Sequence, residues 1–168
     1  QAVTAKEYEE EIKAAYEKLK ALWPSIKVIN SDSPKTPLIQ GNVSIGAIWN
    51  GEAYMAQQEM DNLQYIYPEE GAVLWVDSFV IPKGAANLEN AHKFIDFMLR
   101  AESAKAAIEE LGYAAPNTAG IALLDEDLRN NKTVFPAAED IAKGSFHQDL
   151  GDTVLIYEKY WELLKAGQ

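Results

Sequence analysis

Residues 72–82, AVLWVDSFVIP, are the stretch that decides how we interpret the fold. Nearly all of them are apolar or β-branched, and Gly71 precedes the run. A continuous apolar run of this length is typical of a strand that is buried on both faces of a sheet. Because side chains alternate between the two faces of a strand, Asp77 is expected to point the same way as Trp75.

Asp77 is the unusual member of this strand. Burying even an uncharged polar group without a partner costs about 2–7 kcal/mol, so a buried carboxylate needs one. The partner could be a cation of the protein, a helix N-terminus or a ligand. A simpler interpretation places Asp77 at a solvated strand end or at the cap of a neighbouring helix. The residues alone leave these alternatives open.

Helices and strands are predicted to alternate along the rest of the chain, which favours an α/β fold. A capping-box pattern at Thr4 and Glu7 predicts a first helix that reaches about Leu22 and ends at Pro24. The predicted strands are 25–29, 42–49, 63–67 and 72–82. The predicted helices are 5–22, 37–40, 52–60, 88–99, 102–111, 118–124, 136–142 and 152–165, whereas 125–132 and 144–151 are expected to be irregular.

Composition and charge exclude several classes of function. The 168 residues suffice for one domain or two small lobes, and they contain no apolar run of 18 residues that could cross a membrane. The formal net charge of −11 argues against nucleic acid as a partner. Without cysteine there are no disulfides and no thiolate metal sites. The start at Gln1 rather than Met indicates a processed or excised chain.

The sequence contains no motif of an enzyme, so we expect neither catalysis nor a cofactor. A nucleophile elbow, a phosphate-binding glycine loop and a HExxH helix are all missing. His92 and His147 are the only imidazoles and are too isolated for a metal cluster. The acidic run at 125–127 lacks the glycine and the closing glutamate of a calcium loop, so we interpret it as a solvated helix end.

Three aromatic residues stand where ligands tend to bind. Trp49 is predicted at the carboxyl end of a strand, just before a turn into a helix, where open α/β sheets bind ligands. Trp75 shares a strand face with Asp77, and Tyr113 follows a helix stop at Gly112. If they converge, they form an aromatic box with one carboxylate, which suits an ammonium group through cation–π contacts and charge-assisted hydrogen bonds. For each residue taken separately, spacing alone favours an ordinary core aromatic.

Several motifs together resemble those of a known family. They are NSDSP at 30–34, IWNGE at 48–52, LWVDSFVIP at 74–82, LGYAAPN at 111–117, KTVFP at 132–136 and IYEKYW at 156–161. In this order they resemble the carboxyl-terminal half of the spermidine/putrescine-binding periplasmic proteins of bacterial ABC uptake systems. The resemblance implies an α/β fold of the type II periplasmic binding protein class, a mixed sheet flanked by helices. It also implies a fragment of a two-lobed protein whose lobes close on the ligand by a hinge.

The resemblance also implies a set of site residues. Carried over position by position, the polyamine contacts of the family fall on Ser31, Trp49, Trp75, Asp77 and Tyr113. A further contact, usually Gln in the family, falls on His147, with Gln148 as the alternative if the alignment shifts by one residue. A protonated His147 would repel a polyamine. A polyamine bound to this set of residues would explain how Asp77 tolerates burial, because the ligand would supply the cation that pairs with the Asp77 carboxylate.

Family members are about twice as long, so we expect the chain to be a fragment. Residues 1–78 would form the α/β part of the second lobe, 79–120 would cross back toward the first lobe, and 121–168 would return to the second. The expected partners are a polyamine, the membrane permease of an ABC transporter, and either the missing amino-terminal half or a second copy. The location implied is periplasmic or extracytoplasmic, with a lipid anchor in a Gram-positive cell.

Two other functions stay open at this point. One keeps the fold but changes the ligand to another small cation or an amino acid derivative. The other is a half-protein that serves as a folding or interaction module and binds no ligand. The carboxylate of Asp77 between aromatic residues favours amines.

Overall fold

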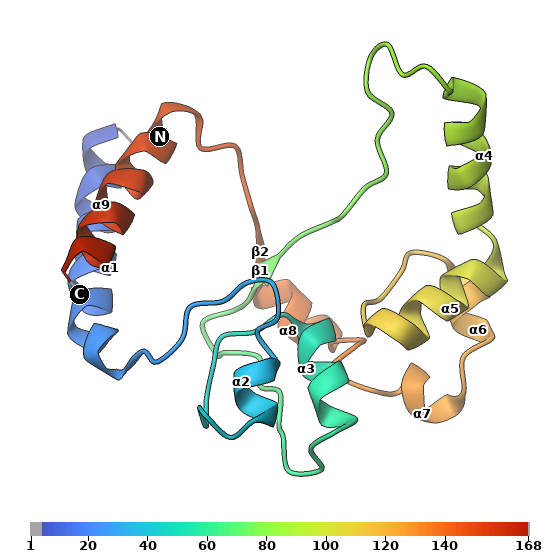
Figure 1. Ribbon diagram of the computed structural model, residues 1–168, viewed down its shortest axis with the longest axis horizontal. Helices are drawn as coiled ribbons and strands as arrows, with labels where there is room; N and C mark the ends of the chain where they lie inside the picture. Colours follow the sequence, from blue (N-terminus) through green and yellow to red (C-terminus); the bar gives the residue numbers. More distant parts are fainter. Residues whose placement is uncertain (1–4, 168) are drawn as a thin grey trace. The chain divides into compact units, whose positions relative to one another are not determined.

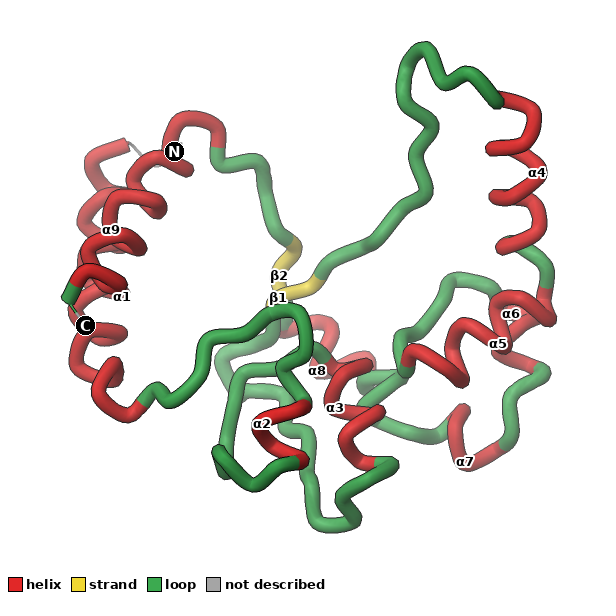
Figure 2. The backbone as a smooth tube through the Cα atoms, viewed as in Figure 1, coloured by secondary structure: helices red, strands yellow, loops and turns green. Residues whose placement is uncertain are grey.

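The computed structural model describes residues 5–167 and divides the chain into two compact units (Figures 1 and 2). The helical unit combines Gln1–Ile29 with Gln148–Gln168, and the central unit is Asn30–His147. The predicted cap at Thr4 lies outside the described residues. The predicted boundaries at residues 78 and 120 concern the lobes of a longer protein, and they stay a prediction.

The helical unit pairs the first and last helices of the chain. Helix α1 (Ala5–Leu22) continues into a 3-10 turn, η1 (Trp23–Ser25), and a second 3-10 turn, η2 (Gly151–Thr153), leads into α9 (Val154–Ala166). Figure 1 shows α1 and α9 side by side, and the two helices are in contact. Ile12 and Leu164 are buried between them, and the rings of Tyr16 and Tyr160 lie 5.3 Å apart.

Helix α1 uses only part of its apolar surface for this packing. Ile12 is buried, whereas Leu19 and Leu22 are exposed.

The central unit consists of short helices joined by long connections. They are α2 (Thr36–Ile39), α3 (Asn50–Gln57), α4 (Leu88–Met98), α5 (Ala101–Leu111), α6 (Thr118–Ala122), α7 (Glu126–Arg129) and α8 (Ala138–Lys143). The sequence predicted the position of each of these helices to within a few residues except α7. Helix α7 begins where the chain was expected to be irregular, because Asp125 caps it by accepting a hydrogen bond from the Leu128 amide at 2.8 Å.

The core of the central unit lies where α5 meets the segment that contains α6 and α7. Four side chains form it: Ile108 and Val134, which are fully buried, and Leu124 and Leu128. Tyr54, Ala115, Ile121 and Phe135 pack around them. This core fixes the carboxyl end of α5 and therefore the loop that follows it.

The predicted strands are mostly wrong. Within residues 5–167, ladder pairing is confined to β1 (Val73–Leu74) and β2 (Ser145–Phe146), which run parallel. Strands predicted at 25–29, 42–49 and 63–67 have no ladder partner, and β2 forms in a stretch predicted to be a loop. Apolar and β-branched residues favour a pleated backbone, but a strand exists only where a second segment supplies the hydrogen bonds.

The same correction applies to the stretch with which the sequence analysis began. Only two of its residues form a strand, and residues 75–80 are exposed rather than buried on both faces. Helix α4, which follows, is poorly covered: Leu88 is 53% exposed, and no residue of α4 is fully buried.

Candidate functional site

Three of the predicted site residues form one aromatic cluster in the central unit. The ring centroids of Trp49 and Trp75 are 4.9 Å apart, and those of Trp75 and Tyr113 are 6.1 Å apart. Both pairs meet edge to face, the arrangement that the quadrupoles of aromatic rings favour. Trp49 is 43% exposed and Trp75 is 36% exposed, so ring surface remains accessible to a ligand. The sequence analysis left this convergence open, as the condition for an aromatic box.

Trp49 is positioned by the start of α3. Its backbone is extended, with φ −64° and ψ 142°, and its carbonyl accepts the first helical hydrogen bond, from the Ala53 amide at 2.9 Å. The neighbouring Asn50 donates from its side-chain amide to the Thr133 carbonyl at 2.9 Å. The turn from Trp49 into a helix is therefore as predicted, although no strand precedes it.

Trp75 directly follows β1, and the ladder brings His147 beside it. The registered pairs are Val73 with Ser145 and Leu74 with Phe146. The His147 amide donates to the Leu74 carbonyl at 3.4 Å, which extends the pairing by one residue. The structure thus places the backbone of His147 next to that of Trp75, and its side chain is exposed.

Tyr113 is positioned by the end of α5. Gly112 closes that helix with φ +68°, a left-handed conformation that glycine adopts without steric cost. The Tyr113 ring then lies on the first turn of α3. A Cβ on Gly51 would come within 2.5 Å of Cε2 and Cζ of that ring. Gly51 is therefore what allows the ring to approach the helix so closely.

The surroundings of the Tyr113 phenol change its pKa. Its pKa is raised, chiefly because burial disfavours the phenolate, and the negative charges of Glu52 and Asp77 contribute. A hydrogen bond from the Glu52 backbone acts in the opposite direction. Both carboxylate charges therefore favour the protonated phenol.

Asp77 is exposed, so the prediction of a buried carboxylate is wrong. The chain leaves β1 after Leu74, and Asp77 lies in the unpaired stretch that follows. The alternative, a solvated position beyond the end of the strand, is the correct one. A ligand is therefore not needed to explain how the fold tolerates Asp77.

Ser31 is not joined to the aromatic cluster by any interaction within the described residues. It is exposed and lies in a loop held by Asn30, whose side-chain oxygen accepts hydrogen bonds from the amides of Asp32 (2.9 Å) and Ser33 (3.3 Å). A hydrogen bond of 2.8 Å between the hydroxyls of Ser33 and Thr36 connects this loop to α2.

An ion pair that sequence reasoning missed links α2 to α3. Lys35, the residue before α2, donates to both carboxylate oxygens of Glu52, at 3.0 and 3.2 Å. Glu52 belongs to the IWNGE motif, but nothing in the sequence indicates that its partner is Lys35. The two side chains are only 24% and 15% exposed.

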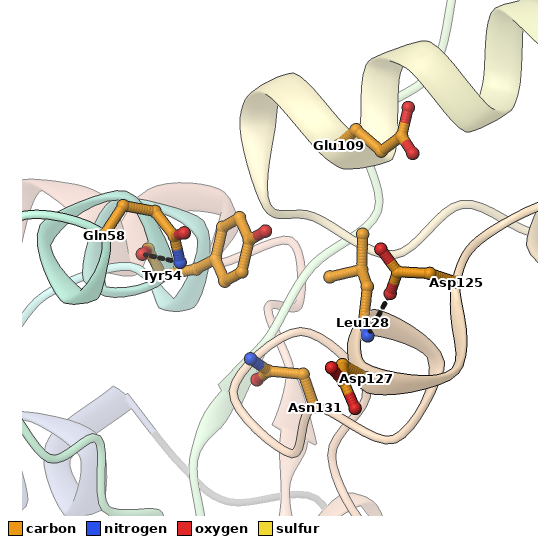
Figure 3. Close-up of a pocket in the computed structure, with 7 residues that line it drawn as sticks. All are labelled: Tyr54, Gln58, Glu109, Asp125, Asp127, Leu128 and Asn131. Carbon is orange, nitrogen blue, oxygen red and sulfur yellow. Dashed lines mark hydrogen bonds between the residues drawn. The ribbon is translucent and has the colours of Figure 1, made fainter.

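The central unit also contains an acidic cavity of about 440 Å³, apart from the predicted residues (Figure 3). Tyr54, Gln58, Glu109, Asp125, Asp127, Leu128 and Asn131 line it. Burial raises the pKa of Tyr54, and the charges of Asp125 and Glu109 add to the effect. Two of the carboxylates already have partners, because Asp125 caps α7 and Glu109 pairs with Lys105 at 2.6 Å. None of the predicted site residues lies in this cavity.

Two further kinds of site were sought in the part of the chain that the structure describes. Among residues 8–167, whose side chains the structure describes, no three acidic or histidine side chains come together as a group that could hold a metal ion. None of the described helices is both long and apolar enough to span a membrane.

Comparison with known sequences identifies relatives that share most of this chain. A family described as bacterial extracellular solute-binding protein matches residues 1–136. The spermidine/putrescine-binding periplasmic protein of Salmonella typhimurium is 44% identical over 158 residues, which is 94% of this chain and 45% of the relative. Spermidine/putrescine-binding periplasmic protein 1 of Haemophilus influenzae is 36% identical over 94% of this chain and 44% of its own length. The chain therefore spans about half the length of these curated relatives.

Solved structures give the same result for the fold. A spermidine/putrescine ABC transporter protein of Listeria monocytogenes has a TM-score of 0.86 at 31% identity, over 93% of this chain and 48% of that one. The spermidine/putrescine substrate-binding protein of Streptococcus pneumoniae has a TM-score of 0.74 at 34% identity, over 90% and 47%. The expected fold class is confirmed: the chain has the fold of part of a two-lobed periplasmic binding protein. By its sequence and its fold, this chain belongs to the bacterial extracellular solute-binding protein family.

Proposed function

We propose that this chain is part of the solute-binding component of an ABC importer and that it binds polyamines, putrescine or spermidine, without catalysing a reaction. The observation that carries the proposal is the cluster of Trp49, Trp75 and Tyr113, which offers accessible ring surface, with the exposed Asp77 two residues after Trp75 in the chain. The names of the relatives support the same class of ligand.

The chemistry of the cluster suits an ammonium group. Each cation–π contact contributes roughly 0.5–2 kcal/mol, with the larger values where the cation is desolvated. A carboxylate at the edge of the rings adds a charge-assisted hydrogen bond. In this proposal the rings hold the aliphatic chain and one ammonium group, and Asp77 accepts a hydrogen bond from that group. Ser31 and His147 would add polar contacts.

The length of the relatives and an exposed apolar patch indicate a polypeptide partner for this chain. The chain covers 45% of them, and α4 with the preceding stretch leaves large apolar side chains exposed, including Phe79, Val80, Phe94 and Phe97. The rings of Phe79 and Phe94 are in contact at 5.7 Å, so the patch is continuous there. Exposed apolar patches mark interaction surfaces. We infer that residues 79–120 pack on a polypeptide corresponding to the rest of the relatives' length, or on a second copy.

The complete protein would deliver its ligand to a membrane permease from a periplasmic or extracytoplasmic location. In a Gram-positive cell a lipid anchor would hold it there. Sedimentation of this chain tests the inferred packing, because a patch of this kind should produce dimers at high concentration. A chain that stays monomeric at all concentrations, and that does not bind the amino-terminal half of the Listeria relative, would contradict it.

Titration calorimetry with putrescine and spermidine at low salt tests the binding itself. Trp75→Leu should abolish the heat of binding, since Trp75 contacts both other rings of the cluster. Trp161→Leu is the matched control, because Trp161 is comparably exposed at 42% and lies in the helical unit. Equal heats from the two variants would contradict the assignment. Heat with an amino acid and none with an amine would favour a different solute.

A further inference from the structure

The pair of Lys35 and Glu52 lies beside the candidate site. Glu52 is in the first turn of α3, one residue after Gly51, and the Tyr113 ring lies on that turn. Lys35 holds the carboxylate through both oxygens, at 3.0 and 3.2 Å. The pair therefore lies next to the turn of α3 that the Tyr113 ring contacts.

The pair is more shielded from water than the other ion pairs of the central unit. Its side chains are 24% and 15% exposed, compared with 68% and 83% for Lys93 and Glu89. Removing one partner from a shielded pair leaves an uncompensated charge, which then needs another counter-ion. An ammonium group of a bound amine would be the nearest replacement for the Lys35 ammonium.

We propose that Lys35 and Glu52 determine the charge selectivity of the candidate site: Lys35 neutralises Glu52, so that the exposed carboxylate of Asp77, two residues after Trp75, is left for an amine. This inference rests on the proposed function and deepens it. Putrescine carries two ammonium groups and spermidine three, so each uncompensated carboxylate favours the more highly charged amine. Lys35 thus limits how strongly this part of the chain favours spermidine.

The variants change the net charge of the pair in different ways, so each should change the amine affinity in its own direction. Lys35→Met leaves Glu52 negative and should raise the affinity for both amines. Glu52→Gln leaves Lys35 positive and should lower both. The double variant has the same charge as the wild type and should bind like it. If the pair only held α2 against α3, both single variants would weaken binding, and the double variant would stay weak.

Titration calorimetry of the wild type and the three variants with putrescine and spermidine decides between these patterns. We expect Lys35→Met to tighten spermidine binding by about two- to fivefold, and putrescine binding by less, since one partly exposed charge contributes up to about a factor of five. Lys35→Arg is the matched control, because guanidinium also pairs with both oxygens of a carboxylate, and it should bind like the wild type.

Two outcomes would overturn the inference. One is weaker binding by both single variants, and the other is a double variant that binds no better than Glu52→Gln. The second comparison remains valid even if Lys35→Met alone does not fold, which circular dichroism would reveal. If the wild type binds neither amine, the proposed function fails for this chain, and the inference is then judged by Lys35→Met alone. If Lys35→Met then binds an amine, the inference is supported. If Lys35→Met binds none, the inference is overturned along with the proposed function.

Discussion

The indole of Trp75 packs edge to face against the indole of Trp49, with 4.9 Å between the ring centroids and 66° between the ring planes. Trp49 caps the start of α3 and Trp75 directly follows β1, so this contact joins the ends of two backbone elements that carry the candidate site. The Tyr113 ring also contacts Trp75. The relationship makes Trp75 the central member of the cluster.

Asp77→Asn should weaken amine binding without destabilising the fold. A hydrogen bond to a charged group contributes about 1.5–3 kcal/mol, and because Asp77 is exposed we expect the lower end, roughly a tenfold loss. Calorimetry measures the affinity, and thermal melting followed by circular dichroism should give an unchanged midpoint. Asp61→Asn, at another exposed position of the central unit, should change neither. Equal affinities for wild type and Asp77→Asn would remove Asp77 from the site.

Gly51→Ala should disturb the aromatic cluster by displacing the Tyr113 ring from α3. The new Cβ would lie 2.5 Å from the Leu111 carbonyl oxygen and from two carbons of the Tyr113 ring, so the backbone or the ring must move. Overpacking of this kind costs about 1–3 kcal/mol. The melting temperature and the amine affinity should both fall. Gly46→Ala is the control, since no atom lies within 4 Å of its Cβ. A fully stable Gly51→Ala variant would mean that the ring is not held against α3.

Ile108→Ala tests the core that fixes the end of α5. Ile108 is fully buried, and truncating such a side chain costs about 2–5 kcal/mol. Urea unfolding followed by the fluorescence of the tryptophans should show this loss. Ile66→Ala removes the same atoms at a site that is 75% exposed, so its effect should stay within about 0.5 kcal/mol. Similar losses from the two variants would argue against the described core.

Deprotonation of Tyr67 should lower the free energy of unfolding at alkaline pH. Burial raises the pKa of Tyr67 to about 12, from an ordinary value of 10.0, and the charges of Tyr65 and Asp140 add to the rise. Its hydroxyl donates to the Thr133 carbonyl at 3.1 Å, which also requires the protonated form. The folded state holds this proton more tightly than the unfolded state. The contribution of Tyr67 to the free energy of unfolding is therefore complete below the pKa of the unfolded state, and it is lost as the pH rises toward the pKa of the folded state.

The measurement for Tyr67 is the free energy of unfolding between pH 8 and 12 for the wild type and Tyr67→Phe, a range that brackets about 10 to about 12. Phenylalanine keeps the ring but has no proton to lose, so the alkaline slope of the variant should be smaller. Parallel slopes for the two proteins would show that Tyr67 titrates normally.

The sequence by itself determined the helices, the family and the identity of the aromatic residues. Helices α3, α5 and α9 lie close to their predicted positions because helical hydrogen bonds are local, and the stop at Gly112 is readable from the chain. The motifs around Trp49, Trp75 and Tyr113 likewise indicated the residues that the structure brings together.

Only the tertiary structure decided the strands, the exposure of Asp77 and the pairing of Lys35 with Glu52. A strand needs a partner that can lie far away in the sequence, as β1 and β2 do, and no local pattern names that partner. Apolar runs such as residues 75–80 therefore predicted burial that the described residues do not provide. The ion pair depends on how α2 and α3 pack, and the sequence does not specify side-chain distances between separate helices.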